Sequence, residues 1–258
     1  MITTKVPNNW RGLQDEVAQI LKECGFKVEV EKVVEGVRGT VEIDVYAEEY
    51  IQGRKYAIVC ECKNWQSRVP QNVIHGFRTI LGDLGANIGY IISTSGFQSG
   101  AFSAAELTNV QLVDWPQFQN AFEKSWYDSF LVPQITERLD PLFTYTEPLF
   151  PHWFNDLTEE DHRQFLTLKR QYDDFGYLMM RFSIYYRQFL EAEKIDLPLS
   201  LRIVEKEKFG KSIPQHILDH TGYREFLEDA LAFGQKGIAK FRAIRDRYVP
   251  GTKIDQGE

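Results

Sequence analysis

The spacing of hydrophobic residues changes several times in the first half of the chain, and each spacing predicts a different element. A helix is expected to begin after Asn8 or Asn9, either of which is a good N-cap, and to end at Gly25, because the apolar residues between them recur at helical spacing. Three strand-like runs follow, at residues 26–34, 41–47 and 55–63. Glycines in the gaps between these runs predict turns there.

A second set of elements completes the first half. A helix is expected from about Pro70, which suits a first-turn position, to Leu84. After it we expect a short buried strand at 88–93, a helix within 101–107, a strand at 110–113 and a helix at 115–124. A hairpin or meander followed by a β-α-β crossover makes an α/β fold, in which a mixed sheet is flanked by helices on both faces.

The pattern changes after Lys124. An aromatic-rich stretch is interrupted by four prolines, Pro133, Pro141, Pro148 and Pro151. Beyond them we expect a long helix at about 158–193, a short β-like piece at 199–204, a last helix at about 223–248 and an unstructured tail after 250. We therefore expect two domains, an α/β domain of residues 1–124 and a mainly α-helical domain of residues 125–258.

Composition narrows the class of protein. Hydrophobic residues make up 43% of the chain and charged residues 26%, which is typical of a soluble globular protein. There is no apolar run of the roughly 20 residues that a membrane helix needs and no apolar stretch resembling a signal peptide, so we expect no membrane partner and a cytoplasmic location. The three cysteines, Cys24, Cys60 and Cys62, are too few for a disulfide framework and are expected to pack in the core.

Charge argues against tight, non-specific binding to nucleic acid. The formal net charge is −7, and residues 1–124 contain 12 basic and 15 acidic side chains, so that half is not basic either. An enzyme that visits DNA transiently can use a local basic patch, and a bound divalent ion offsets carboxylates in a site. The charge therefore lowers the expected affinity without excluding catalysis on DNA.

Three charged residues lie in two adjacent predicted strands. Asp44 occupies the strand 41–47, while Glu61 and Lys63 share one face of the strand 55–63. If the strands pair as a hairpin, the two carboxylates can lie close together, and oxygen ligands favour a hard cation such as Mg²⁺ or Mn²⁺. Lys63 could then orient or help to deprotonate an attacking water. The alternative is a structural ion pair at the strand ends.

Several motifs in the same order resemble one family of nucleases. They are Leu-Gln-Asp-Glu-Val-Ala-Gln-Ile-Leu before Gly25-Phe26, then Glu-Ile-Asp44, Glu61-Cys-Lys63, Val69-Pro-Gln71, Gly89-Tyr-Ile-Ile-Ser-Thr-Ser-Gly-Phe97 and Leu112-Val-Asp114. Over about residues 10–118 the chain is similar to the PD-(D/E)xK nuclease superfamily, and within it to the Mrr-type restriction endonuclease domain. The resemblance implies the restriction-endonuclease fold and metal-dependent cleavage of DNA.

The resemblance also implies roles for individual residues. Asp44 and Glu61 match the family's metal-binding acids, and Lys63 matches its catalytic lysine. Gln71 matches a glutamine that helps to shape the site, and it is expected in the first turn of the second helix. Glu16 matches an acid on the first helix that often completes the site, although a solvated helix charge is the alternative.

Four further residues are candidate contacts to DNA. Asn64 and Arg68 lie in the loop just after Lys63, where side chains could reach the phosphate backbone. His75 and Arg78 share a helical stripe with Gln71 opposite the apolar face of the second helix, and an exposed polar face is the plainer interpretation of that stripe.

The sequence therefore predicts a Mg²⁺- or Mn²⁺-dependent DNA endonuclease that serves restriction or defence against foreign DNA. Two alternatives stay open. One is a repair or recombination nuclease on the same fold, such as a junction resolvase, and the other is an inactive nuclease fold that acts as an interaction module. Cutting both strands needs two sites, which favours a homodimer with DNA as its other partner.

Overall fold

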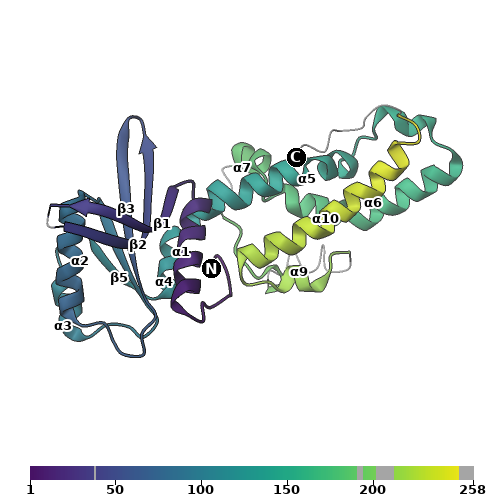
Figure 1. The fold of residues 1–258 in the computed structure, drawn as a ribbon. Coiled ribbons are helices and arrows are strands. Elements are labelled where there is room, and N and C mark those ends of the chain that lie inside the picture. The colour runs from purple at the N-terminus through teal and green to yellow at the C-terminus, as the bar shows by residue number, and fades with distance from the viewer. Residues whose placement is uncertain (38, 191–193, 202–211, 250–258) are drawn as a thin grey trace. The chain divides into compact units, whose positions relative to one another are not determined.

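The computed structural model describes residues 1–37, 39–190, 194–201 and 212–249. It divides into two compact units, the N-terminal unit Met1–Ser129 and the C-terminal unit Phe130–Glu258, and each is described by itself (Figure 1). None of the helices in the described ranges is both long and apolar enough to cross a membrane.

The N-terminal unit begins with helix α1, Trp10–Glu23. Asn9 is its N-cap, with a side-chain oxygen that accepts the backbone N–H of Gly12 at 2.8 Å. After the C-cap Cys24, Gly25 has a φ of 97°, a left-handed conformation that costs glycine little. On the apolar face of the helix, Leu13, Val17, Ile20 and Leu21 are fully buried.

Five strands form one mixed sheet in the order β1-β2-β3-β4-β5. Their bounds are β1 Lys27–Gly36, β2 Gly39–Ile51, β3 Arg54–Lys63, β4 Ile88–Ser93 and β5 Val110–Val113. The first three strands pair antiparallel because short turns join them, and β3, β4 and β5 pair parallel because helices cross between them. The predicted mixed sheet with flanking helices is confirmed.

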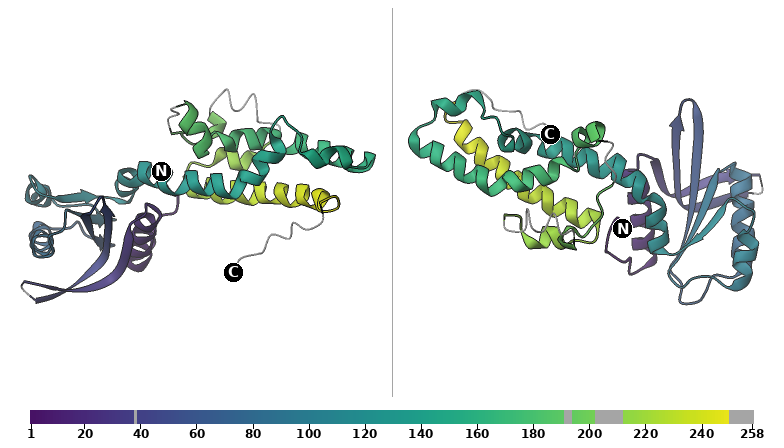
Figure 2. Two further views of the ribbon diagram at one scale, coloured as in Figure 1. Left: turned by 90° about the horizontal axis from the view of Figure 1, so that it is seen from above. Right: turned by 180° about the vertical axis from the view of Figure 1, so that it is seen from behind.

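The remaining helices of this unit are α2 (Gln71–Leu84), α3 (Ser99–Ala105) and α4 (Trp115–Trp126). The sheet lies between α1 with α4 and α2 with α3 (Figures 1 and 2). One core cluster joins Ile74, Phe77 and Leu81 of α2 to the sheet. Gly89 in β4 permits this close approach, since a Cβ there would lie 2.5 Å from side-chain carbons of Phe77 and Leu81.

The C-terminal unit is mainly helical, as predicted. It contains α5 (Val132–Thr146), α6 (Glu159–Met180), α7 (Ile184–Leu190), α9 (Gln215–Asp219) and α10 (Tyr223–Arg245), with short 3-10 turns at His152–Asp156 and Leu199–Leu201. A π-helical turn, Tyr127–Leu131, precedes α5. Helices α5, α6 and α10 pack on one another around aromatic side chains such as Phe165, Phe175 and Phe241. A Cβ on Gly237 of α10 would lie 2.7 Å from the ring of Tyr172, so glycine allows these helices to approach closely.

The prediction of one helix over 158–193 is wrong. Helix α6 ends at Met180, and α7 begins at Ile184. The Ser183 hydroxyl donates to the carbonyl of Met180, and the backbone N–H of Ile184 donates to Thr136 Oγ1 at 3.0 Å, so side chains replace the helical hydrogen bonds. Residues 191–193 lie outside the described residues.

Two smaller predictions for this unit also need correction. Leu199–Leu201 is a 3-10 turn rather than a strand, and the rest of the β-like piece, 202–204, lies outside the described residues, as does the tail after 249. The last helix ends at Arg245 and is followed by a turn that reaches Tyr248. Helix α5 was not predicted, and Pro141 lies inside it, because burial of residues such as Leu139 and Leu142 offsets the lost backbone hydrogen bond.

Candidate active site

The three predicted catalytic residues lie on neighbouring antiparallel strands. Val45 of β2 pairs with Cys60 of β3, so Asp44 and Glu61 occupy the next position along the two strands. Asp44 Oδ2 accepts the backbone N–H of Cys62 at 2.7 Å, and Lys63 Nζ is paired with Glu61 Oε1. The side chains of Glu61 and Lys63 are 21% and 16% exposed, so the pair is largely withdrawn from water but open to a ligand.

Around Asp44, burial and the negative charge of Glu61 outweigh the groups that stabilise an ionised carboxylate. Burial raises the pKa of the Asp44 carboxyl above its ordinary value, and the negative charge of Glu61 raises it further. The Cys62 N–H and the charge of Lys63 act in the opposite direction without reversing the shift. The ionised form of Asp44 is therefore less favourable here than in water, and additional positive charge nearby would stabilise it.

Backbone strain lies beside the same position. The register pairs Val30 with Val45 and Lys32 with Ile43, and Glu31 between them has a φ of 52°. Residues other than glycine seldom adopt this left-handed backbone conformation within a strand. Glu31 also contributes a further negative charge toward Asp44. Strain of this kind is concentrated at functional sites, where the surrounding structure holds it in place.

Helix α1 contributes a residue that the sequence analysis did not identify. Gln14 is 1% exposed, and its Nε2 donates to the backbone carbonyl of Asp44 at 2.9 Å. A polar residue on the apolar face of α1, between Leu13 and Val17, was the available signal. Glu16, the predicted acid of this helix, is half-buried and has a partner, and its role at the site stays a prediction.

Gln71 is the first residue of α2, as expected. Its amide oxygen lies against α3, since a Cβ on Gly100 would be 2.5 Å from it. The structure therefore places the Gln71 side chain in the gap between the starts of α2 and α3, and the predicted role in shaping the site is not tested by this contact.

The predicted DNA contacts are distributed over the β3–α2 loop and α2. Arg68 and His75 are exposed, and Asn64 is half-buried. The guanidinium of Arg78 donates to the carbonyl of Ala104 in α3 at 3.3 Å, so this side chain joins two helices. Of the four candidates, Arg78 therefore has a structural partner that a phosphate contact would have to replace.

The β3–α2 loop is held by the turn that follows β4. Ser95 Oγ donates to the carbonyl of Ser67 at 2.6 Å, and the backbone N–H of Val69 donates to the carbonyl of Gly96 at 3.0 Å. The Ser-Thr-Ser-Gly turn thus fixes the chain directly after Lys63.

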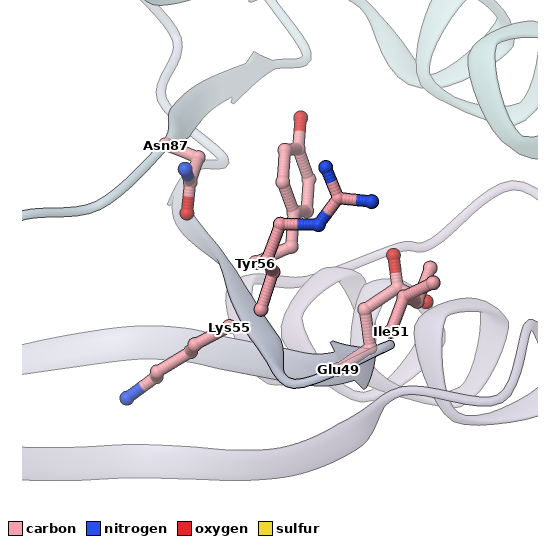
Figure 3. A pocket seen from close by; sticks show the side chains of 6 residues that line it. Glu49, Ile51, Lys55, Tyr56 and Asn87 are labelled. Atoms are coloured by element: carbon pink, nitrogen blue, oxygen red, sulfur yellow. The ribbon is translucent and has the colours of Figure 1, made fainter.

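A separate pocket of about 350 Å³ lies at the other end of β3 (Figure 3). Its lining comes from the hairpin end and the start of β4, namely Glu49, Ile51, Arg54, Lys55, Tyr56 and Asn87. Lys55 is paired with Glu48 at 2.8 Å, and Asn87 accepts the backbone N–H of Ala57 at 2.7 Å. At about 3.3 Å per residue along a strand, this pocket is roughly 20 Å from Glu61 and takes no part in the cluster.

The cluster can offer a metal ion two carboxylates. In the part of the chain that the structure describes, no group of three His, Cys, Asp or Glu side chains could hold an ion. Cys60 and Cys62 are buried free thiols, and burial raises their pKa values, which disfavours the thiolate form that binds metal ions. Asp44 and Glu61 are therefore the oxygen donors that a hard cation would meet at the cluster.

Comparisons with known proteins give one informative match. No curated protein matches the chain. The solved structure "Protein of Unknown Function AF1548" aligns with 88% of this chain and 96% of its own, at 16% identity and a TM-score of 0.36, a likeness too weak to carry an argument. The family model for the Mrr catalytic domain, described as restriction endonuclease, matches residues 7–122, which include the whole sheet and the cluster. Residues 7–122 therefore form a restriction endonuclease-like nuclease domain of the Mrr type.

Proposed function

We propose that this protein is a metal-dependent DNA endonuclease in which Asp44, Glu61 and Lys63 carry out phosphodiester hydrolysis. The observation that carries the proposal is the meeting of two carboxylates and a lysine on adjacent strands of an Mrr-type domain. A purely structural ion pair would account for Glu61 with Lys63, but it would not account for an acid placed where its own charge is disfavoured.

The donor set fits Mg²⁺ or Mn²⁺. Mg²⁺ is commonly held by one or two carboxylates and keeps several waters, so Asp44 and Glu61 suffice. A divalent ion would relieve the repulsion that raises the pKa of Asp44. When bound, such an ion polarises the phosphate and makes water a stronger nucleophile.

The residues of the chain supply position and charge. Lys63 carries three N–H donors on a side chain that Glu61 holds, and it can orient the attacking water and offset negative charge on the phosphate. Gln14 and the Cys62 N–H fix the backbone and the carboxylate of Asp44 respectively. These contacts hold the residues of the site in place before DNA binds. Groups that are already oriented for the reaction lower its activation barrier.

Restriction of foreign DNA is the role we assign to this activity, on the resemblance to the Mrr-type family. The inactive interaction module is disfavoured, because a binding module has no need of Asp44 in an environment that disfavours its charge. Cleavage of branched against linear duplex separates a restriction enzyme from a repair or recombination nuclease.

The direct test is incubation with methylated and unmethylated plasmid, with Mg²⁺, with Mn²⁺ and with chelator. We expect nicked or linear products only with a divalent ion, and none from the Asp44→Asn variant. Isothermal titration should detect binding of Mg²⁺ or Mn²⁺ to the wild type that the variant lacks. Absence of cleavage on every DNA form, together with absence of ion binding, would overturn the proposal.

A further inference from the structure

Trp65 is an exposed aromatic residue two positions after Lys63. Of the five tryptophans in the chain, Trp115, Trp126 and Trp153 are at most 5% exposed, whereas Trp65 is 42% exposed. Indole is a large apolar group that normally gains stability from burial, so this ring contributes less to folding than the others. Trp10 is exposed to a similar extent, 40%, so what distinguishes Trp65 is its position next to the candidate active site.

The position of this ring is set by its neighbours. The loop that carries it is tied to the turn after β4 through Ser67 and Val69. Lys63 Nζ lies over the indole, 5.1 Å from the ring centroid, a cation–π distance. The ring is therefore fixed beside the lysine that the proposed function places at the phosphate to be cut.

The protein's charge limits what phosphate contacts alone can provide. The net charge is −7, and the affinity of most DNA-binding proteins comes largely from basic side chains that neutralise phosphates. Stacking of a base on an aromatic ring adds affinity that needs no positive charge and tolerates any sequence. In a continuous duplex, however, both faces of each base are already covered by neighbouring bases. A ring beside the backbone gains stacking only from a base that has left the helix.

We propose that Trp65 stacks on an unpaired base next to the cleaved phosphate, so that the preferred substrate class is DNA with an unstacked nucleotide at the cut. The inference rests on the proposed function, since it needs DNA at Lys63. It goes further by naming the form of DNA and the residue that selects it.

The test uses the full chain and matched variants. Trp10 is the control, because it is 40% exposed on the same unit and has a cation, Arg11, 5.9 Å from its ring centroid. Trp65→Ala, Trp65→Phe and Trp10→Ala are compared with the wild type. Affinity is measured for a short oligothymidylate, for its abasic counterpart and for a duplex, with Ca²⁺ in place of Mg²⁺, and KM and kcat are measured with Mg²⁺.

We expect Trp65→Ala to weaken binding of oligothymidylate by about 5- to 150-fold, the range given by base stacking on an aromatic residue. Binding of the abasic strand should be unchanged in that variant, Trp65→Phe should retain most of the affinity, and Trp10→Ala should behave as wild type. Quenching of tryptophan fluorescence by the oligonucleotide should be lost in Trp65→Phe.

Other outcomes would contradict the stacking of a base on Trp65, and all but the last of them leave the proposed nuclease function intact. Equal loss on the thymidylate and abasic strands makes Trp65 a general backbone contact. A fall in kcat with unchanged affinity means that Trp65 only positions Lys63. If Trp65→Ala binds and cuts as wild type does, the inference fails and the nuclease proposal stands. If the wild type neither binds nor cuts any DNA, the proposed function fails and the inference with it.

Discussion

Two buried or half-buried aspartates, one in each unit, lie in opposite environments. In the C-terminal unit, Asp161 of α6 is 6% exposed and accepts hydrogen bonds from the hydroxyls of Tyr248 and Thr158, with Arg247 paired to its other oxygen. Hydrogen bonds from Tyr248 and Thr158 and the charge of Arg247 hold the pKa of this carboxyl below its ordinary value. Its environment therefore favours the charged form.

Asp44 in the N-terminal unit has the reverse arrangement. The backbone N–H of Cys62 donates to the carboxylate. Glu61 and Glu31 add negative charge nearby, which the charge of Lys63 offsets only in part. Burial raises the pKa here, whereas donors lower it at Asp161. An aspartate can therefore join two elements of a fold or bind a ligand. The hydrogen-bond donors and cations around its carboxylate distinguish these two roles.

The largest expected effect is on the rate of DNA cleavage, and it concerns Lys63 in the cluster around Asp44. Lys63→Ala should lower the rate of DNA cleavage by on the order of 10²-fold or more, because the lysine serves the attacking water. The matched control is Lys55→Ala on the same strand, whose partner is Glu48 at the far end of the hairpin. Initial rates on plasmid measure both. Equal rates for Lys63→Ala and wild type would reduce Lys63 to a structural partner of Glu61.

A smaller loss is expected from Gln14→Ala. Removing a hydrogen bond worth about 1 kcal/mol from the backbone of Asp44 should reduce kcat by roughly 5-fold, with KM little changed. Gln119 is a control of similar burial, since it accepts the backbone N–H of Thr3 at 2.8 Å away from the cluster. Gln119→Ala should lower thermal stability and leave kcat of the folded fraction unchanged. Equal kcat values for the two variants would show that Gln14 supports the fold and not the site.

The C-terminal unit is predicted to mediate assembly. Its aromatic residues are largely buried in its own helices, and residues 125–258 have no net basic character. The reason to expect a dimer is that cutting both strands needs two nuclease sites, and a unit without basic character is better suited to contact a second copy than DNA. We expect the full chain to sediment at about twice the monomer mass and a fragment ending at Ser129 to sediment as a monomer that still binds DNA. If both are monomers, and only the full chain binds DNA, the C-terminal unit is the part that recognises DNA.

Most of the N-terminal fold could be predicted because its elements are short and bounded by turn residues. The bounds of β4, 88–93, and β5, 110–113, match the prediction, since both are brief apolar runs between polar residues. Strand β2 extends beyond its predicted end to Ile51, because Glu49–Ile51 pair with β3 in a hairpin past the pairing with β1. That extension depends on cross-strand hydrogen bonds, which leave no hydrophobic pattern.

What the sequence could not provide came from contacts between distant segments. The break between α6 and α7 depends on Thr136 of α5, 48 residues before Ile184. The part played by Gln14 depends on a carbonyl 30 residues away. Asp44, Glu61 and Lys63, by contrast, could be proposed from sequence because charged residues in apolar strands are costly without partners.

The smallest expected effect is on the pH dependence of thermal stability, and it tests the difference between Asp44 and Asp161 most directly. For an acid with a raised folded-state pKa, the ionised form costs stability above that pKa, and the cost disappears below it. Asp44→Asn should therefore raise the thermal midpoint at neutral pH in chelator, and the gain should fade as the pH drops through the raised pKa. For Asp161, with a lowered pKa, stability is present above the ordinary pKa and lost below the folded one, so Asp161→Asn should lower the midpoint at neutral pH.

Calorimetry of the two variants from neutral to acid pH measures this difference. Asparagine keeps the size of the side chain and an oxygen that can accept the Cys62 N–H, so the change isolates the charge at position 44. Added Mg²⁺ should raise the midpoint of the wild type and of Asp161→Asn but not that of Asp44→Asn, because a ligand stabilises only the state that binds it. Shifts of the same sign in both variants would mean that the two carboxylates have the same role, and the distinction between a structural and a functional aspartate would be wrong.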